Sequence, residues 1–282
     1  MSKRVLILGM VPFDSGKTVL ASLLAKNLVA RGESVEYIKP ISGHNYWFRY
    51  EHTQRCLAEK KLYSFDAFKV RQHLGQRVAI EISNPIHTLF VPAILNTPDE
   101  MVPGSLALAG KDSVFAMQRI SRPQAAGVKS FMLMAKRLID SGKLIMSPSE
   151  AELLSYESEP VSISEYNEAV AYTENVIEDA LDASLRTIED NADYVLIEGF
   201  NNAAWLWNGL DHVDRVLVAG PGHVFIYNPE RFRKAVLLKK YNSQPIREVP
   251  FSRVSDLIKP TDRVLLAPSR DLENSQVKNM IL

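Results

Sequence analysis

The residues whose types and spacing could do chemistry lie near the N-terminus, in the segment Ser-Gly-Lys-Thr at residues 15–18. The apolar run over residues 4–9 predicts a buried strand before this segment, and residues 19–31 have the pattern of a helix that ends at Gly32. Such a turn can bind phosphate through backbone N–H groups, the helix dipole, a lysine and a hydroxyl that binds Mg²⁺. We therefore predict a nucleotide phosphate site formed by Asp14, Ser15, Gly16, Lys17, Thr18 and Val19.

This loop differs in length from the standard phosphate-binding motif. The motif has a glycine five residues before Gly16, a position that Val11 occupies here. The nearest earlier glycine is Gly9, so the turn is longer than the standard one. Its position directly between an expected strand and an expected helix still favours phosphate binding.

A carboxylate ends a second apolar strand, which the sequence predicts over residues 192–199 after a long helix from Ser164 to about Asp190. At the C-terminal end of a parallel strand, Glu198 could face the phosphates held after the first strand and assist Mg²⁺. The simpler alternative is a solvated residue at the end of the strand.

Lys39 ends another expected strand, over residues 35–39, and precedes Pro40. A lysine at the end of a buried strand is costly to desolvate unless an anion pairs with it. We therefore favour a contact with phosphate or substrate over an ordinary surface lysine.

Composition limits the classes of partner and compartment. The chain has 282 residues, of which 46% are hydrophobic, and its 33 basic and 33 acidic residues leave a formal net charge of zero, so nucleic acid is not an expected partner. The single cysteine, Cys56, excludes an internal disulfide and favours a cytoplasmic setting. The first apolar run is too short for a signal peptide and no later run is long enough to span a bilayer, so we expect a soluble protein without a membrane partner.

The order of the expected elements predicts an α/β fold. The strand, helix and strand of the first 39 residues predict a parallel sheet covered by helices. Further along, we expect a helix over residues 50–73, irregular chain over residues 77–121, and a helix over residues 123–141 with buried methionines. The whole chain is expected to form one domain over residues 1–282, with an insertion at about residues 75–162 that is too long for a plain connection.

Three segments together resemble one family of enzymes. Residues 13–20, 37–43 and 192–199 resemble, in order, the phosphate loop, the Lys-Pro segment and the Glu-Gly strand of dethiobiotin synthetases. Residues 64–68 and 248–251 resemble segments of the same family more weakly. The specific part of the resemblance covers the first ~45 residues and about residues 165–200.

The resemblance implies a three-layer P-loop NTPase fold with a mostly parallel central sheet. In that family ATP and Mg²⁺ drive the carboxylation of a vicinal diamine, the phosphorylation of the carbamate and the closure of a cyclic urea. By motif, it implies that Lys17 and Lys39 are catalytic and that Lys39 and Ser42 contact the substrate. The metal ligands that it implies are Thr18, Asp66 and Glu198, and a homodimer is expected.

The chain also departs from the family. Residues 200–205 replace its glycine-rich continuation, residues 213–229 hold no counterpart of its adenine loop, and a long stretch separates Asp66 from Ser164. The departures leave two expectations, a true dethiobiotin synthetase and a related Mg-ATP-dependent ligase or kinase. The related enzyme would phosphorylate a carbamate or carboxylate on a small molecule bulkier than the diamine.

Other functions are weighed against this one. A nucleotide-controlled regulatory or assembly ATPase that acts on a protein partner is the alternative, but related switch proteins carry a lysine where this chain has Val11 and Pro12. The histidine spacing and single cysteine argue against a zinc site. Aromatic residues at 46–50 could stack on a base or pack an inserted helix, and Trp205 and Trp207 are expected to be partly solvated at the mouth of the sheet.

Overall fold

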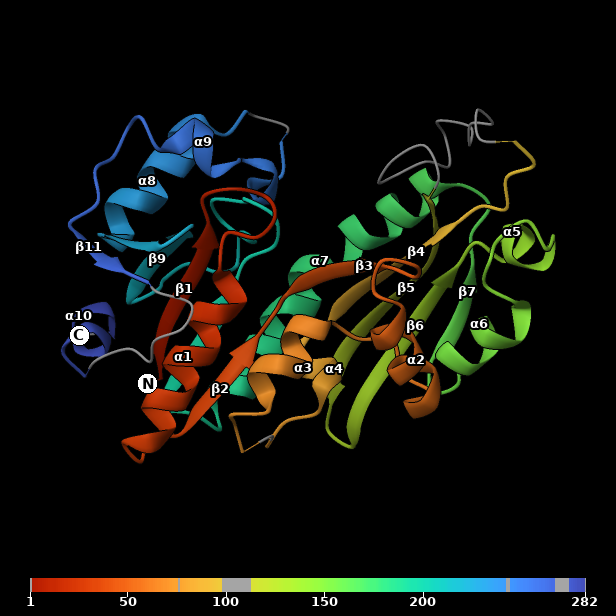
Figure 1. Cartoon of the computed structure of the whole chain (residues 1–282), viewed down its shortest axis with the longest axis horizontal. Coiled ribbons are helices and arrows are strands. Elements are labelled where there is room, and N and C mark those ends of the chain that lie inside the picture. The colour runs from red at the N-terminus through yellow and green to blue at the C-terminus, as the bar shows by residue number, and fades with distance from the viewer. Residues whose placement is uncertain (1, 76, 98–112, 242–243, 267–273, 282) are drawn as a thin grey trace. The chain divides into compact units, whose positions relative to one another are not determined.

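The computed structural model describes residues 2–75, 77–97, 113–241, 244–266 and 274–281. They form an α/β protein with two mixed sheets, as Figure 1 shows. The chain divides into two compact units, the first formed by residues 1–40, 66–83 and 181–282 and the second by residues 41–65 and 84–180. Within the described ranges, no helix combines the length and the apolar character needed to cross a bilayer.

The first unit contains a six-stranded sheet with the strand order β11-β10-β9-β1-β8-β2. Its strands are β1 (Lys3–Gly9), β2 (Val35–Ile38), β8 (Tyr194–Glu198), β9 (Arg215–Gly220), β10 (His223–Tyr227) and β11 (Asp262–Leu265). β1 pairs in parallel with β8 and β9, and β2 pairs in parallel with β8, whereas β10 and β11 add antiparallel partners. Because Leu6 and Ile38 are both in register with Ile197, the carboxyl ends of β1, β2 and β8 lie at one edge of the sheet.

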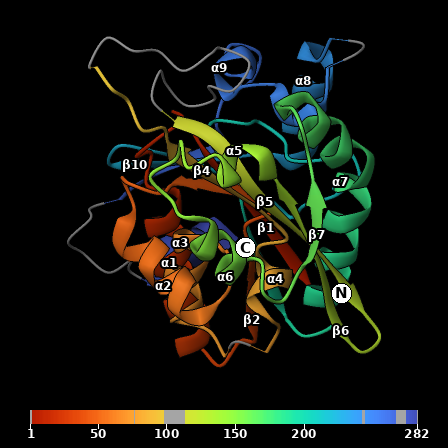
Figure 2. The same cartoon turned by 90° about the vertical axis from the view of Figure 1, so that its right-hand side faces the viewer.

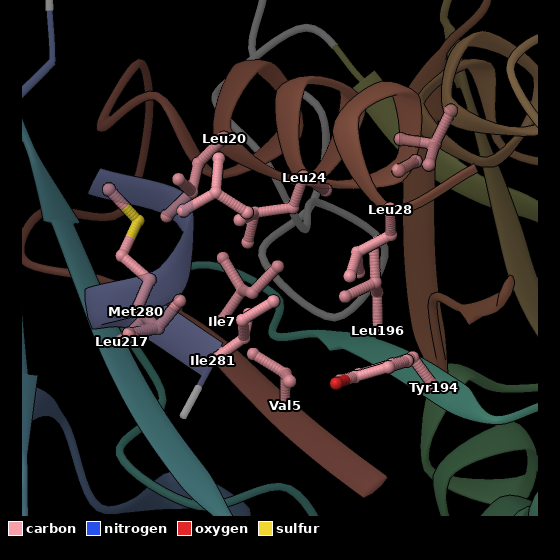
Figure 3. Packing of buried hydrophobic residues seen from close by; sticks show 14 of the residues in the cluster. Val5, Ile7, Leu20, Leu24, Leu28, Tyr194, Leu196, Leu217, Met280 and Ile281 are labelled. Atoms are coloured by element: carbon pink, nitrogen blue, oxygen red, sulfur yellow. The ribbon is translucent and has the colours of Figure 1, made fainter. Parts of the chain in front are cut away.

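Both faces of this sheet are covered, which is consistent with a three-layer arrangement. Along β1 the side chains alternate between the two faces, and Val5 through Leu8 are all fully buried. On one face, Leu20, Leu24 and Leu28 lie four residues apart in α1 and pack toward the strands, as seen in Figure 3. The helices of this unit are α1 (Lys17–Ala30), α3 (Phe65–Arg71), α4 (Ile80–Ser83), α8 (Pro229–Lys239), a 3₁₀ helix (Ile246–Glu248), α9 (Phe251–Val254) and α10 (Asn274–Ile281).

The second unit contains a five-stranded sheet with the order β3-β4-β5-β6-β7. Its elements are β3 (Ile41–Asn45), α2 (Tyr50–Glu59), β4 (Ile86–Pro92), β5 (Ser113–Gln124), β6 (Gly127–Met134), α5 (Lys136–Asp140), α6 (Pro148–Leu154) and β7 (Glu159–Ser162). The first part of α7 (Tyr166–Glu189) runs beside β5, where the Thr173 hydroxyl donates to Gln118 Oε1 at 2.6 Å (Figure 2).

The helix expected over residues 123–141 is wrong. Residues 127–134 form β6, which pairs with β5 in an antiparallel hairpin, and only α5 is helical in this stretch. Met132 and Met134 are buried, as expected, but in a strand. A run of large apolar residues suits both structures, and pairing with β5 satisfies its backbone groups as a strand.

Two other boundaries also differ from expectation. The helix expected over residues 50–73 is two helices, α2 and α3, because Lys60 adopts φ 54° and ends α2. The irregular structure expected over residues 77–121 is wrong where the structure describes it, since α4, β4 and β5 occur there, while residues 98–112 lie outside the described ranges. The long helix expected over residues 164–190 is confirmed as α7. Compactness alone does not define a domain, so one domain with an insertion at residues 75–162 stays a prediction.

Candidate nucleotide phosphate site

The loop between β1 and α1 leaves the first turn of the helix open to an anion. Gly16 precedes α1 with φ 90°, a left-handed conformation that glycine adopts without strain, and Asp14 has φ 53°. Among the described residues, no side chain caps α1. The first backbone N–H groups of this 14-residue helix are therefore left for solvent or a bound anion, which the helix dipole would attract.

Gly9 leaves the space in which the lysine of the loop lies. A Cβ at this position would be 2.6 Å from both Lys17 Nζ and Ser15 Oγ and 3.0 Å from the Val11 carbonyl oxygen. A side chain at residue 9 would displace the Lys17 ammonium and the Ser15 hydroxyl, so the glycine leaves room for the position that Lys17 takes here.

Lys17 is a buried cation that forms no ion pair with any carboxylate among the described residues. Its ammonium donates to the Asn201 carbonyl at 2.8 Å and the Ser15 hydroxyl at 3.1 Å, and only 8% of the residue is exposed. Across the described part of the chain, no carboxylate lies within ion-pair distance of it. Burial, together with the positive charge of Lys39, lowers the pKa of Lys17 to about 8. A bound anion would supply the missing countercharge.

Glu198 connects the loop with β2. Its Oε1 accepts hydrogen bonds from the Thr18 hydroxyl at 2.9 Å and from Lys39 Nζ at 2.5 Å, and its Oε2 accepts from the Tyr37 hydroxyl at 2.8 Å. The residue is fully buried at the end of β8. Its carboxylate therefore accepts from three donors on two segments, the start of α1 and the end of β2, at the carboxyl edge of the sheet.

Lys39 lies between two carboxylates. Its ammonium contacts Glu198 at 2.5 Å and Asp66 Oδ2 at 2.9 Å, and the Asp66 side chain is 39% exposed. Burial acts to lower the pKa of Lys39, but the two carboxylates outweigh it and hold that pKa above its ordinary value. Lys39 is therefore a permanently charged group beside the loop, in contrast to Lys17.

The oxygen donors at this site suit Mg²⁺. The Thr18 hydroxyl and the Glu198 carboxylate lie within 2.9 Å of each other, and Asp66 joins them through Lys39. Mg²⁺ prefers such oxygens and usually binds one or two protein carboxylates while phosphate and water complete its shell. Within the described ranges, no group of three or more His, Cys, Asp or Glu side chains could hold a metal by itself. A Mg²⁺ ion held jointly by Thr18, Glu198 and phosphate fits these residues.

The structure brings together most of the residues that the sequence suggested. Ser15, Gly16, Lys17, Thr18, Lys39, Asp66 and Glu198 belong to one connected cluster or adjoin it. Asp14 and Val19 flank it with exposed side chains. Ser42 lies in β3 of the second unit and contacts His87 and Asn84 there.

Two members of the cluster were missed from the sequence. The hydroxyl of Tyr37 donates to Glu198 from within β2, a strand whose four residues are all buried, so no pattern in the sequence distinguishes this tyrosine. Asn201 accepts from Lys17 through its backbone carbonyl, so its residue type carries no signal at all.

The expectation that Trp205 and Trp207 are partly solvated is wrong. They are 1% and 0% exposed, and their indole N–H groups donate to the Leu210 carbonyl at 2.9 Å and to Asp182 Oδ1 at 2.7 Å. Both polar ends are satisfied inside the protein, so the two rings belong to the core. Of the aromatic stripe, Tyr46 is buried while Trp47 and Phe48 are exposed.

Comparisons with known proteins found no match. No family model, no curated protein and no solved structure matches this chain.

Proposed function

We propose that this chain binds Mg-ATP at the loop between β1 and α1 and transfers its γ-phosphoryl group to a carboxylate or carbamate oxygen of a small molecule. One observation carries the proposal: Lys17 is a buried ammonium, held at the open start of a helix, with no carboxylate to pair with among the described residues. A triphosphate supplies the charge that this position lacks. The resemblance to dethiobiotin synthetases supports a P-loop fold, a small-molecule acceptor and a homodimer.

In this proposal the loop residues bind and orient the nucleotide. Lys17 contacts the β- and γ-phosphates, and the N–H groups of the first turn of α1 surround them. Thr18 and Glu198 are the groups that would hold Mg²⁺, which neutralises phosphate charge when it is bound. Tyr37 keeps the Glu198 carboxylate oriented through its hydrogen bond to Oε2.

Lys39 can offset the repulsion between the two anions that react. A carboxylate or carbamate oxygen that attacks a phosphoryl group brings two anions together, and a fixed cation at that point stabilises the charge of the transition state. Because Glu198 and Asp66 keep Lys39 charged and in place, it needs little reorganisation for this role.

Nucleotide binding tests the first half of the proposal. Lys17→Ala should abolish Mg-ATP binding in calorimetric titration while the protein remains folded, because phosphate and not the core requires the ammonium. Lys26→Ala, on the exposed side of the same helix, is the matched control and should bind as the parent does. A folded Lys17→Ala protein with parental affinity would overturn the proposal.

Isotope exchange tests the second half. With ATP labelled by ¹⁸O in the β–γ bridge, reversible formation of an acyl phosphate scrambles the label between bridging and non-bridging positions. We expect scrambling that requires a small carboxylic or carbamic acid as acceptor. ATP hydrolysis that no small acid alters, and that a protein partner stimulates, would instead support an assembly ATPase.

A further inference from the structure

A continuous chain of polar side chains crosses β3, β4 and α2 in the second unit. Ser42 Oγ lies 2.6 Å from His87 Nδ1, His87 Nε2 lies 2.7 Å from His44 Nδ1, and His44 Nε2 lies 3.1 Å from Thr53 Oγ1. Ser42 is half-buried, whereas the other three are buried. One end of this Ser42–His87–His44–Thr53 relay is therefore accessible and the rest is sheltered from water.

Backbone groups lie within hydrogen-bond distance at both ends of the relay. At one end, the Ser64 N–H donates to Asn84 Oδ1 at 2.9 Å, so the Asn84 NH₂ group must be the one that lies 2.7 Å from Ser42 Oγ. At the other end, the Thr53 hydroxyl lies 3.3 Å from the carbonyl oxygens of Tyr46 and Arg49, which can only accept.

One proton arrangement that agrees with these contacts starts from Thr53. When Thr53 donates to a carbonyl, it accepts from His44 Nε2–H, which leaves His44 Nδ1 as an acceptor. His87 therefore donates from Nε2 and presents the lone pair of Nδ1 to Ser42. The Ser42 hydroxyl receives the Asn84 N–H and, in this arrangement, donates its own proton to His87 Nδ1 at 2.6 Å rather than to the more distant Ile86 carbonyl oxygen at 3.4 Å.

The buried histidine in the middle is a neutral group. Burial, with smaller contributions from His52 and Arg49, lowers the pKa of His44 to about 3. The His52 ring packs edge-on against His44 at 5.0 Å, and its own Nε2 donates to the Tyr63 carbonyl at 2.7 Å. A neutral His44 can accept at Nδ1 from His87 Nε2–H, which leaves His87 Nδ1 as the basic nitrogen toward the serine.

We propose that Ser42 is a nucleophilic serine, that His87 is its general base, and that the substrate class is activated esters. His44 and Thr53 are positioning residues that hold His87 in the reactive tautomer. The arrangement has the three components of a catalytic triad: a serine nucleophile, a histidine base and a group that orients the base. Here the orienting group is the neutral histidine, His44. It lies within the second unit and goes beyond the proposed phosphoryl transfer.

The reaction balances without a cofactor. Ser42 Oγ forms a bond to the ester carbonyl carbon as its proton passes to His87 Nδ1. Collapse of the adduct breaks the bond to the leaving oxygen, which takes the proton from His87 and departs as an alcohol. Water, deprotonated by His87 in the same way, then hydrolyses the acyl-serine and releases the acid.

A fluorophosphonate probe tests the nucleophile directly in the full-length protein. Attack by Ser42 forms an O–P bond and expels fluoride, so we expect mass spectrometry to find the phosphonyl group on Ser42. Ser42→Ala should remove the labelling, and Ser130→Ala, a change at a half-buried serine on β6 of the same sheet, should leave labelling as in the parent. No modification of Ser42 in the parent protein would overturn the proposal.

Variants of the relay test the base and its orientation. His87→Asn should slow labelling by roughly 10²-fold or more, since general-base assistance contributes that much. Thr53→Val should slow it by roughly tenfold while Thr53→Ser restores it, because only the hydroxyl fixes the tautomer. Equal labelling rates for folded Thr53→Val and Thr53→Ser proteins, or a folded His87→Asn protein that labels at the parental rate, would contradict the assigned roles. If His87→Asn does not fold, the two Thr53 variants decide.

Discussion

Lys17 and Lys39 belong to the same cluster, yet burial has opposite outcomes for their pKa values. Lys39 has carboxylates at 2.5 and 2.9 Å, so its pKa is raised despite burial. Lys17 has only a hydroxyl and backbone carbonyls as hydrogen-bond acceptors in the described structure, and its pKa is lowered to about 8. The residue that lacks a countercharge is the one expected to recruit an anion.

The lowered pKa of Lys17 predicts proton uptake on nucleotide binding. The free protein loses the Lys17 proton as pH rises through about 8, and bound phosphate raises this pKa again by supplying negative charge. Affinity for Mg-ATP should therefore fall as pH rises above 8. Calorimetry near pH 8.5 in buffers of different ionisation enthalpy should show uptake of a fraction of a proton. The Lys26→Ala control should show the same uptake, and a pH-independent affinity between 7 and 10 would contradict this assignment.

Replacing Glu198 should separate metal use from nucleotide binding. Glu198→Gln keeps acceptor and donor atoms beside Thr18 and Tyr37 but removes the charge, so turnover should fall on the order of 10²-fold. ADP binding should change far less, because Lys17 and the helix start are untouched. Steady-state rates over a range of Mg²⁺ concentrations measure the effect. Glu189→Gln, which removes a carboxylate paired with Arg4, is the control, and unchanged Mg²⁺ dependence in Glu198→Gln would make Glu198 a structural residue only.

At the scale of elements, the turn from β1 into α1 has room for the Lys17 ammonium because Gly9 has no side chain. Gly9→Ala would put a Cβ 2.6 Å from Lys17 Nζ and Ser15 Oγ, so the ammonium must move. Loss of a charge-assisted contact predicts an affinity for Mg-ATP lower by about tenfold or more. Gly75→Ala is the control, since only the Arg77 side chain lies near that position. Parental affinity in Gly9→Ala, measured by titration calorimetry, would show that the loop rearranges at no cost.

The hairpin between β5 and β6 depends on one glycine conformation. Gly127 has φ 124°, and no atom of the described residues lies within 4 Å of the point that a Cβ would occupy, so backbone conformation alone opposes a side chain. Gly127→Ala should lower the free energy of unfolding by about 1–2 kcal/mol, measured in urea. Gly75→Ala, which has no positive φ to lose, should change it by much less. An unchanged midpoint for Gly127→Ala would mean that the hairpin adopts another turn.

At the scale of the whole molecule, the chain passes between its two units at residues 40–41, 65–66, 83–84 and 180–181. Each unit has its own sheet and its own buried polar system: the lysine and carboxylate cluster in the first, and the histidine relay in the second. The two systems respond to different ranges of pH.

Acid should destabilise the protein through His44. Its folded pKa, about 3, lies below the unfolded value of 6.5, so the unfolded chain binds more protons between these limits. The free energy of unfolding should therefore fall as pH decreases from about 6.5 toward 3. His44→Gln should weaken this dependence, measured by urea unfolding at pH 7 and pH 4. An equal loss of stability in parent and variant would mean that His44 is not the group responsible.

Local sequence alone predicted the part of the fold in which neighbouring residues decide the structure. A short apolar run, a glycine turn and a helix follow one another within residues 3–30, so chain connectivity imposes their contacts. Lys39 and Glu198 were identifiable because each polar residue ends an apolar strand. The α/β class followed from the same signals.

Tertiary structure decided everything that depends on partners distant in the chain. Residues 127–134 are a strand because β5 pairs with them, although their composition suits a helix equally well. Trp205 and Trp207 can be buried because Leu210 and Asp182 accept their indole N–H groups. The four residues of the relay come together only once β3, β4 and α2 assemble.

The charge states of the two buried lysines also depend on tertiary structure. Lys17 begins α1 and Lys39 follows β2. Contacts with Glu198 and Asp66 raise the pKa of Lys39, whereas burial and the nearby charge of Lys39 lower the pKa of Lys17. These electrostatic energies depend on distances and burial that spacing along the chain does not contain.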